Sequence, residues 1–324
     1  SFSKANMEAE AVVFSIDIAE DATPKVLERI LSADKNPIAS IQFEKGTYHF
    51  YPDKAYETYC QISNHDDVLT RTAFPLFNFK DIAIDGQGST FIFHGKMIPF
   101  IIDGCENIEV KNLSVDWAQT FHSEGLVVAN DEENNSFDLQ ISDEYPYEIR
   151  NEQLIFIKEY YEHTLIGQSI LYDPERKAIA FNTEAYTPIG AMKKHKVSHN
   201  LDRIQYKYKI DRRAPEMAQI GRENRMRVEQ IKPGLVRVFN NKKKLPPVGN
   251  ILVSKGIKGY QGGNRQAPAF RVIRTVGFDA KNVNVHHAGG MGLIAENCEN
   301  LVLDGFNVTP SNGRMVSTTA DATH

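Results

Sequence analysis

Apolar and polar residues alternate with a period of two along much of the chain, and the alternation recurs as a repeated unit. Residues 100–115 match residues 293–308, and both copies carry Cys-Glu-Asn at the same place. Two shorter copies of the centre of the unit lie at residues 80–86 and 281–287. Because a period of two marks strands with one buried face and the polar breaks mark corners, the pattern predicts coils of short strands stacked along an axis.

The spacing of the repeat bears on the class of fold. Asp81 and Asn107 are 26 positions apart, and Asn282 and Asn300 are 18 positions apart. These spacings bracket one turn of a β-solenoid and are too short for a βαβ unit with its return. The recurring asparagines predict side-chain hydrogen bonds from coil to coil at one corner.

An antiparallel sandwich is the competing interpretation, since its strands alternate in the same way. A sandwich does not repeat Cys-Glu-Asn followed by alternating apolar residues in register, so the solenoid is favoured. We expect Cys105 and Cys298 to point inward at the corner that carries the asparagines.

The first fifty residues predict a cap and the opening of the first coil. Thr23 is suited to cap a helix, Pro24 to occupy its first position, and the apolar stripe consists of Val26, Leu27, Ile30 and Leu31. This helix is expected to cover the open end of the solenoid. Residues 41–50 then predict a strand, a glycine turn and a second strand.

Between Trp117 and about Gln261 the coil pattern is replaced by longer strands with separate turns. Strands are predicted at residues 154–157, 178–181, 204–208 and 235–239. Because the repeat resumes afterwards, an inserted barrel-like module is favoured over a separate linked domain. The predicted fold is therefore all-β, a right-handed parallel β-helix with a short N-terminal capping helix. Its parts are residues 1–117 (cap and first coils), 118–261 (insert) and 262–324 (resumed coils).

Charge, hydropathy and cysteine usage exclude several classes of function. The chain has 37 Lys+Arg against 42 Asp+Glu, so its net charge of -5 would repel a phosphate backbone, and nucleic acid is not an expected partner. No apolar stretch approaches the ~18 residues of a membrane span. The three cysteines are far apart, which fits neither a disulfide scaffold nor a zinc site. No metal or cofactor is expected.

The residues with chemical potential gather near the end of the sequence. They include His286, His287, a glycine-rich stretch at residues 289–292, and small and hydroxyl residues at 317–324 around Asp321. A carboxylate such as Asp321 can serve as a general acid or base, although a solvated surface role is the simpler explanation of the pattern. For Trp117, packing at a hinge and stacking on a sugar ring are both open.

Residues 286–294 and 317–324, on a β-helix with a β insertion, resemble glycoside hydrolase family 110. That family contains bacterial exo-α-1,3-galactosidases that remove terminal α-1,3-linked galactose, including that of blood-group-B-type glycans, with inversion and without a metal. The resemblance implies that Asp321 is one of the catalytic aspartates. It also implies an oligosaccharide or glycoconjugate substrate, no cofactor, and an exported protein in the periplasm or outside the cell.

In family 110 the chain continues beyond this point, and the companion aspartates follow about one coil after the position of Asp321. We therefore expect this sequence to be an N-terminal portion with little or no turnover by itself. Coils ~4.8 Å apart would bring such carboxylates near the ~6.5–9.5 Å separation of an inverting enzyme. Trp117 is a candidate sugar contact, and so are the residues expected near Asp321 if the coils stack: Arg274, His287, Arg314 and His324.

Two other functions fit the same fold. A polysaccharide lyase would need clustered acidic calcium ligands and a basic residue facing a uronate, and the sequence shows no such cluster. A glycan-binding or structural β-helix, such as an adhesin or tailspike, is compatible with the insert and with Trp117.

Overall fold

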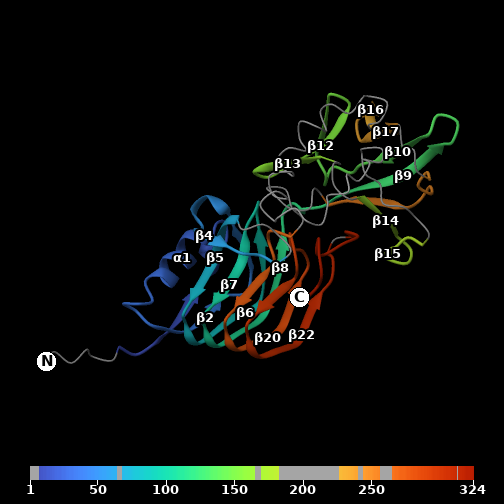
Figure 1. The fold of residues 1–324 in the computed structure, drawn as a ribbon. Coiled ribbons are helices and arrows are strands. Elements are labelled where there is room, and N and C mark those ends of the chain that lie inside the picture. Colours follow the sequence, from blue (N-terminus) through green and yellow to red (C-terminus); the bar gives the residue numbers. More distant parts are fainter. Residues whose placement is uncertain are drawn as a thin grey trace, which may run out of the picture. The chain divides into compact units, whose positions relative to one another are not determined.

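The computed structural model describes residues 7–63, 68–164, 169–181, 226–239, 244–255, 265–311 and 313–324, and it is mainly β (Figure 1). The chain forms two compact units. The first unit contains Ser1–His122, Lys158–Tyr161 and Ile257–His324, and the second contains Ser123–Ile157 and Glu162–Gly256. In the described ranges, no helix is long and apolar enough to cross a membrane.

Two sheets of mainly parallel strands make up the first unit. The larger sheet has the order β1 (Glu10–Phe14), β2 (Ile38–Phe43), β6 (Lys80–Phe93), β8 (Glu106–Trp117), β20 (Val276–Val285) and β22 (Glu299–Val308), with β3 (Thr47–Phe50) also paired to β6. The smaller sheet has the order β21 (Leu293–Glu296), β19 (Phe270–Ile273), β7 (Ile98–Asp103), β5 (Val68–Phe77) and β4 (Tyr56–Cys60). Among the described strands of these two sheets, β4 and β5 pair antiparallel and the other pairs are parallel.

The chain alternates between the two sheets. Strand β5 leads into β6, β7 into β8, β19 into β20, and β21 into β22, each time through two connecting residues. We call each such pair of strands with its corner a rung, numbered one to four in this order. The four rungs lie side by side because β6, β8, β20 and β22 are neighbours in the larger sheet (Figure 1).

The first residue of each of these corners has a left-handed backbone. The φ angles are 59° for Asn78, 67° for Gly104, 46° for Arg274 and 53° for Asn297. Glycine adopts this conformation without strain, and asparagine tolerates it better than most residues do. Three of the four corners thus have a residue that the local backbone favours, and Arg274 is the exception.

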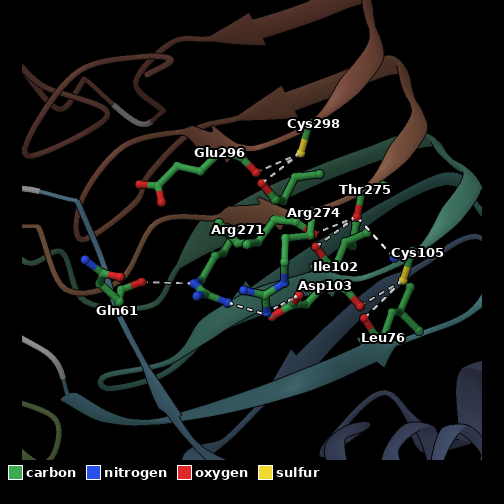
Figure 2. Close-up of polar contacts among 12 residues, drawn as sticks. Gln61, Leu76, Ile102, Asp103, Cys105, Arg271, Arg274, Thr275, Glu296 and Cys298 are labelled. Atoms are coloured by element: carbon green, nitrogen blue, oxygen red, sulfur yellow. Dashed lines mark hydrogen bonds and ion pairs between the residues drawn. The ribbon is translucent and has the colours of Figure 1, made fainter.

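The second corner residue points into the core and bonds to the preceding rung (Figure 2). Cys105 Sγ lies 3.2 Å from the Leu76 carbonyl, Thr275 Oγ1 lies 3.4 Å from that of Ile102, and Cys298 Sγ lies 3.4 Å from that of Val272. Cys105 belongs to the hydrophobic core, and Cys298 packs against it. The expected inward position of the two cysteines is therefore confirmed, and the thiols have a structural role.

Register within the sheets places equivalent residues over one another. Phe74, Phe100, Phe270 and Leu293 occupy one column of the smaller sheet. The rings of Phe74 and Phe100 are 4.4 Å apart, and those of Phe100 and Phe270 are 4.6 Å apart. The match between residues 100–115 and 293–308 is thus confirmed, since Phe100 and Leu293 stand two rungs apart in the same column.

The shorter copy at residues 281–287 was assigned to the wrong corner. Asn282 Nδ2 donates to Asn112 Oδ1 at 3.1 Å, so Asn282 belongs to the column of Asn112 and not to that of Asn107. Asn107 and Asn112 both lie within β8 and both have a left-handed backbone, with φ of 56° at each. The two positions therefore share the same sequence signature. The spacing of 18 does not measure a rung; Asn284 and Asn307, which do stack, are 23 residues apart.

Helix α1 (Thr23–Leu31) packs against β5, and its residues Val26 and Ile30 join the hydrophobic core (Figure 1). The cap position is occupied by Ala22 and not by Thr23. Thr23 Oγ1 instead accepts a hydrogen bond of 2.9 Å from the Tyr51 amide, so its hydroxyl ties the start of the helix to the residue that follows β3. Leu31, placed in the apolar stripe by the sequence, is exposed.

The second unit contains an antiparallel sheet with its own core. Its order is β15 (Ala178–Ile179), β14 (Ser169–Asp173), β18 (Ile251–Ser254), β9 (Ser123–Asp131), β10 (Ser136–Gln140), β17 (Leu235–Phe239) and β16 (Arg227–Lys232). A separate three-stranded sheet consists of β11 (Tyr147–Arg150), β12 (Gln153–Lys158) and β13 (Tyr161–Thr164). Within the described ranges neither sheet closes on itself.

The strands predicted at residues 154–157 and 235–239 are confirmed as β12 and β17. The strand predicted at 178–181 is shorter, since β15 ends at Ile179. The strand predicted at 204–208 lies outside the described residues.

The phenylalanine column predicts a large loss of stability when its middle ring is removed. Phe100→Ala should lower the free energy of unfolding by about 3–5 kcal/mol, because Phe100 is fully buried between two rings. Urea unfolding followed by the fluorescence of Trp117, the single tryptophan, reports on the first unit. Tyr59→Ala, at an exposed position of β4, is the control and should change the free energy by less than about 0.5 kcal/mol. Equal effects of the two substitutions would contradict the stacked column.

Candidate active site

Residues 317–324 form a further strand-like segment at the edge of the smaller sheet. Parallel bridges join Ala288 to Thr318 and Leu293 to Thr323. The amide of Gly292 donates to the carbonyl of Asp321 at 3.2 Å. The backbone of Asp321 is therefore held by hydrogen bonds to the segment that leads into β21.

The glycines beside this segment are required by close packing of backbone on backbone. A Cβ atom at Gly292 would lie 2.6 Å from the Ala322 carbonyl oxygen, and one at Gly290 would lie 2.8 Å from that of Arg265. A Cβ atom at Gly289 would lie 2.6 Å from the ring of Phe121. The glycine-rich stretch thus lets the chain segments approach closely, and the segment that carries Asp321 packs directly against Gly292.

Asp321 presents its side chain to solvent. Its side chain is 59% exposed, and Oδ2 lies 3.5 Å from Nδ1 of His324. On its other side the His324 ring brings Nε2 within 3.5 Å of Ser63 Oγ. An accessible carboxylate next to an imidazole and a hydroxyl can exchange protons with a bound ligand, which suits general acid or base chemistry.

Trp117, His287 and Arg314 lie in the interior, with exposed fractions of 1%, 0% and 7%. Trp117 donates from Nε1 to the Gly95 carbonyl at 2.9 Å and packs against the ring of Phe93. It has no free face for a sugar ring. The structure therefore corrects the expectation of sugar contacts for these three residues, and for Trp117 it favours the packing role.

His287 is a structural residue in its neutral form. Its Nε2 accepts a hydrogen bond of 3.0 Å from the Phe121 amide, and the Phe121 ring stacks on it at 5.8 Å. Burial lowers the pKa of His287 well below its ordinary value, and the nearby positive groups of His122, Arg314 and Lys158 lower it further. The ring thus fixes Phe121, which in turn packs against Gly289.

Arg314 anchors the connection between β22 and the Asp321 segment. Its Nη1 lies 3.0 Å from Asp116 Oδ1 and 3.2 Å from the Trp117 carbonyl. Ser311 Oγ donates to the other oxygen of Asp116 at 2.6 Å. This buried ion pair fixes where the chain enters the candidate site, and the Arg314 side chain does not reach the surface.

Arg274 is separated from Asp321 by the register of the smaller sheet. Thr323 pairs with Leu293, and Leu293 pairs with Phe270, so Asp321 is level with residue 268. Arg274 follows six positions later, which corresponds to ~20 Å along an extended strand. The prediction that Arg274 lies near Asp321 is therefore wrong, whereas His324 is in contact with it.

A charged cluster that sequence reasoning missed lies on the outer face of the same sheet (Figure 2). Asp103 and Arg271 are only 8% and 7% exposed. Arg274 Nη2 lies 2.7 and 2.9 Å from the two oxygens of Asp103, and Arg271 Nη1 lies 3.5 Å from Oδ2. The available signal was the charge of Arg271 inside the otherwise apolar run at residues 267–273.

A second polar cluster holds the hairpin tip of Lys158–Tyr161 in the first unit. The carboxylate of Glu159 lies 2.8 Å from His94 Nδ1, and His94 Nε2 lies 2.9 Å from His49 Nδ1. Burial lowers the pKa of His49, and the neighbouring His94 adds to this effect. In the part of the chain that the structure describes, no group of three or more His, Cys, Asp or Glu side chains could hold a metal ion.

Residues 123–252 match the family described as GLAA-B beta-barrel domain I. The chain is also similar to Alpha-1,3-galactosidase A of Shewanella woodyi, with 34% identity over 94% of this chain and 44% of the relative. It is also similar to Alpha-1,3-galactosidase B of Parabacteroides distasonis (29%, over 94% and 44%) and of Bacteroides thetaiotaomicron (26%, over 91% and 42%).

These relatives confirm the resemblance to glycoside hydrolase family 110, and they fit its N-terminal portion. The chain spans less than half the length of the curated relatives it matches.

The buried neutral state of His287 predicts a pH dependence of stability. Since its folded pKa is depressed, the unfolded chain takes up a proton near pH 6.5 while the folded chain does not, and stability falls as the pH drops below that value. This loss of stability grows as the pH is lowered from 7 to 5. His287→Gln should remove it, so that unfolding free energies followed by Trp117 fluorescence depend less on pH.

The control is His286→Gln, because His286 is the adjacent, less buried histidine and bonds through Nδ1 to the Thr309 carbonyl. It should keep the slope of the unmodified chain. A His287→Gln variant with the same slope as the unmodified chain would show that His287 does not carry this pH dependence.

Proposed function

We propose that the protein to which this chain belongs is an exo-acting α-1,3-galactosidase that removes terminal α-1,3-linked galactose from oligosaccharides or glycoconjugates. The observation that carries the proposal is the similarity of nearly the whole chain to curated α-1,3-galactosidases. The exposed carboxylate of Asp321, held by backbone hydrogen bonds, supplies a group that this chemistry requires. Blood-group-B-type glycans are the proposed natural class, and export to the periplasm or beyond the cell is part of the same proposal.

The proposed mechanism is inversion with two carboxyl groups. One protonates the leaving-group oxygen, and the other deprotonates a water that attacks the opposite face of the sugar. Asp321 is one of the two in this proposal. Its companion comes one or two coils later in the whole protein, because spacings of ~4.8 Å or ~9.6 Å bracket the ~6.5–9.5 Å that leaves room for the water. The same argument leads us to propose little or no turnover by residues 1–324 alone.

We also propose that the rungs belong to a right-handed parallel β-helix interrupted by an inserted module, with the parts at residues 1–117, 118–261 and 262–324. The rungs in register and their two-residue corners support a solenoid. The excursion of the chain into a second compact unit, followed by its return to the next rung, supports the insertion.

Asp321→Asn in the full-length protein should reduce galactose release from an α-1,3-galactoside by about 10²–10⁴-fold, because the amide cannot exchange a proton with the substrate or water. Asp304→Asn, at an exposed aspartate of β22 outside the site, is the matched control and should retain full activity. The measurement is the rate of galactose release at saturating substrate. Normal turnover by Asp321→Asn would exclude Asp321 from the reaction.

Inversion predicts that the first product is β-galactose, since the water attacks from the face opposite the leaving group. Proton NMR of the anomeric hydrogen during the first minutes of turnover, before mutarotation, distinguishes the two anomers. Initial release of α-galactose would show retention and would require carboxyl groups about 5–5.5 Å apart.

A further inference from the structure

A short segment of chain covers the outer face of the smaller sheet next to the candidate site. We call residues 60–63 the strap. Cys60 and Ile62 are buried and pack with Ile98 and Ile101 of β7. The intervening Gln61 offers its carbonyl to Arg271, whose Nε donates to it at 3.1 Å. The strap is thus held by apolar contacts at two alternate residues and by a cation between them.

Arg271 interrupts an apolar column of the outer face. Ile101, Arg271 and Ile294 are equivalent positions on β7, β19 and β21. A buried cation among isoleucines carries a desolvation penalty, so a specific partner must account for it. The equivalent positions on the neighbouring strands carry the aliphatic side chains of Ile101 and Ile294.

Asp103 by itself does not account for Arg271. Both of its oxygens are already within 2.9 Å of Arg274 Nη2, whereas Arg271 Nη1 lies at 3.5 Å. The shortest polar contact of Arg271 is the one to the strap carbonyl. In Figure 2 both guanidinium groups gather around Asp103, and Arg271 also reaches Gln61. Asp103 therefore braces Arg271, and the strap is the group that Arg271 holds.

The strap continues to the candidate site. Ser63 Oγ lies 3.5 Å from His324 Nε2, and His324 Nδ1 lies 3.5 Å from Asp321 Oδ2. By register His324 is also level with Ile294 and Arg271. The contacts therefore form a continuous path from Arg271 through the strap and His324 to Asp321.

We propose that Arg271 is a positioning residue: it fastens the strap to the outer face of the sheet, and the strap sets the place of His324 beside Asp321. The strap then forms one wall of the sugar site. This inference rests on the proposed function for its effect on turnover, but the fastening of the strap is independent of it.

The test compares Arg271→Gln, Arg271→Lys and Arg274→Gln in the full-length protein. Arg274→Gln is the matched control because it removes the other cation from Asp103 without touching the strap. In Arg271→Gln, amide hydrogen exchange of a peptide covering residues 60–63 should rise by about tenfold or more, as expected when a charged hydrogen bond is lost. Arg274→Gln should leave that exchange within about twofold of the unmodified protein.

Turnover of an α-1,3-galactoside provides the second readout. Arg271→Gln should lower kcat by about 10–100-fold through misplacement of groups at the site, with KM changed much less. Arg271→Lys should recover part of kcat and of the exchange protection, since an ammonium can donate to the Gln61 carbonyl. Ser63→Ala should lower kcat while leaving the strap protected, which separates the two links of the path.

Unchanged exchange in Arg271→Gln would overturn the proposal, and so would equal effects of Arg271→Gln and Arg274→Gln, which would indicate an ion pair of general structural importance. A change in KM alone would overturn the positioning role. If the unmodified full-length protein releases no galactose, the proposed function fails, and the exchange comparison alone then decides whether Arg271 holds the strap.

Discussion

Hydrogen bonding between parallel strands in register is the constraint on which the first unit depends. Because side chains alternate between the two faces, a slip of one residue in β7 would send Phe100 and Ile102 outward and bring Asp103 into the core. The register is thus specified by the residues themselves, and it stacks Phe74, Phe100 and Phe270 in one column. Once register is fixed, the outer face is fixed as well, and with it the row that contains Arg271 and His324.

The corners are the second requirement, since each turn between sheets needs a left-handed residue. Asparagine and glycine adopt this conformation at little cost in free energy, as at Asn78 and Gly104. An arginine in the same conformation carries a strain of about 1–2 kcal/mol. In this strained conformation the Nη2 atom of Arg274 lies within 2.9 Å of both carboxylate oxygens of Asp103, and this ion pair offsets the strain. Backbone strain that is offset by a specific ion pair indicates that Asp103 must be held in place, and Asp103 in turn contacts Arg271.

Much of the fold could be predicted from these two requirements, because both leave local signals. The repeat of Cys-Glu-Asn in residues 100–115 and 293–308 is visible in the sequence. The structure places the two copies at equivalent positions two rungs apart. The error at Asn282 has the same origin. Two positions of β8 require the same left-handed backbone, so Asn107 and Asn112 have equivalent sequence surroundings, and only the pairing of Asn282 with Asn112 distinguishes them.

The site was less predictable, because burial at a given residue depends on segments that are remote in sequence. Small residues around Asp321 indicated an accessible carboxylate, and the structure exposes it. Nothing near His287 revealed that Phe121, 166 positions away, would donate to it and enclose it.

The strap could not be predicted from the sequence for the same reason, since Gln61 and Arg271 are 210 residues apart. The pairing of strands can be predicted from the local sequence pattern, and this pairing positions the backbone of Asp321. The side chains that surround that carboxylate come from distant turns and from connecting segments, where no periodicity applies. We therefore infer that an exposed carboxylate on such a fold is easier to find from sequence than the side chains that surround it, and that a charge inside an apolar strand, such as Arg271, is a sequence signal by which those distant contacts can be sought.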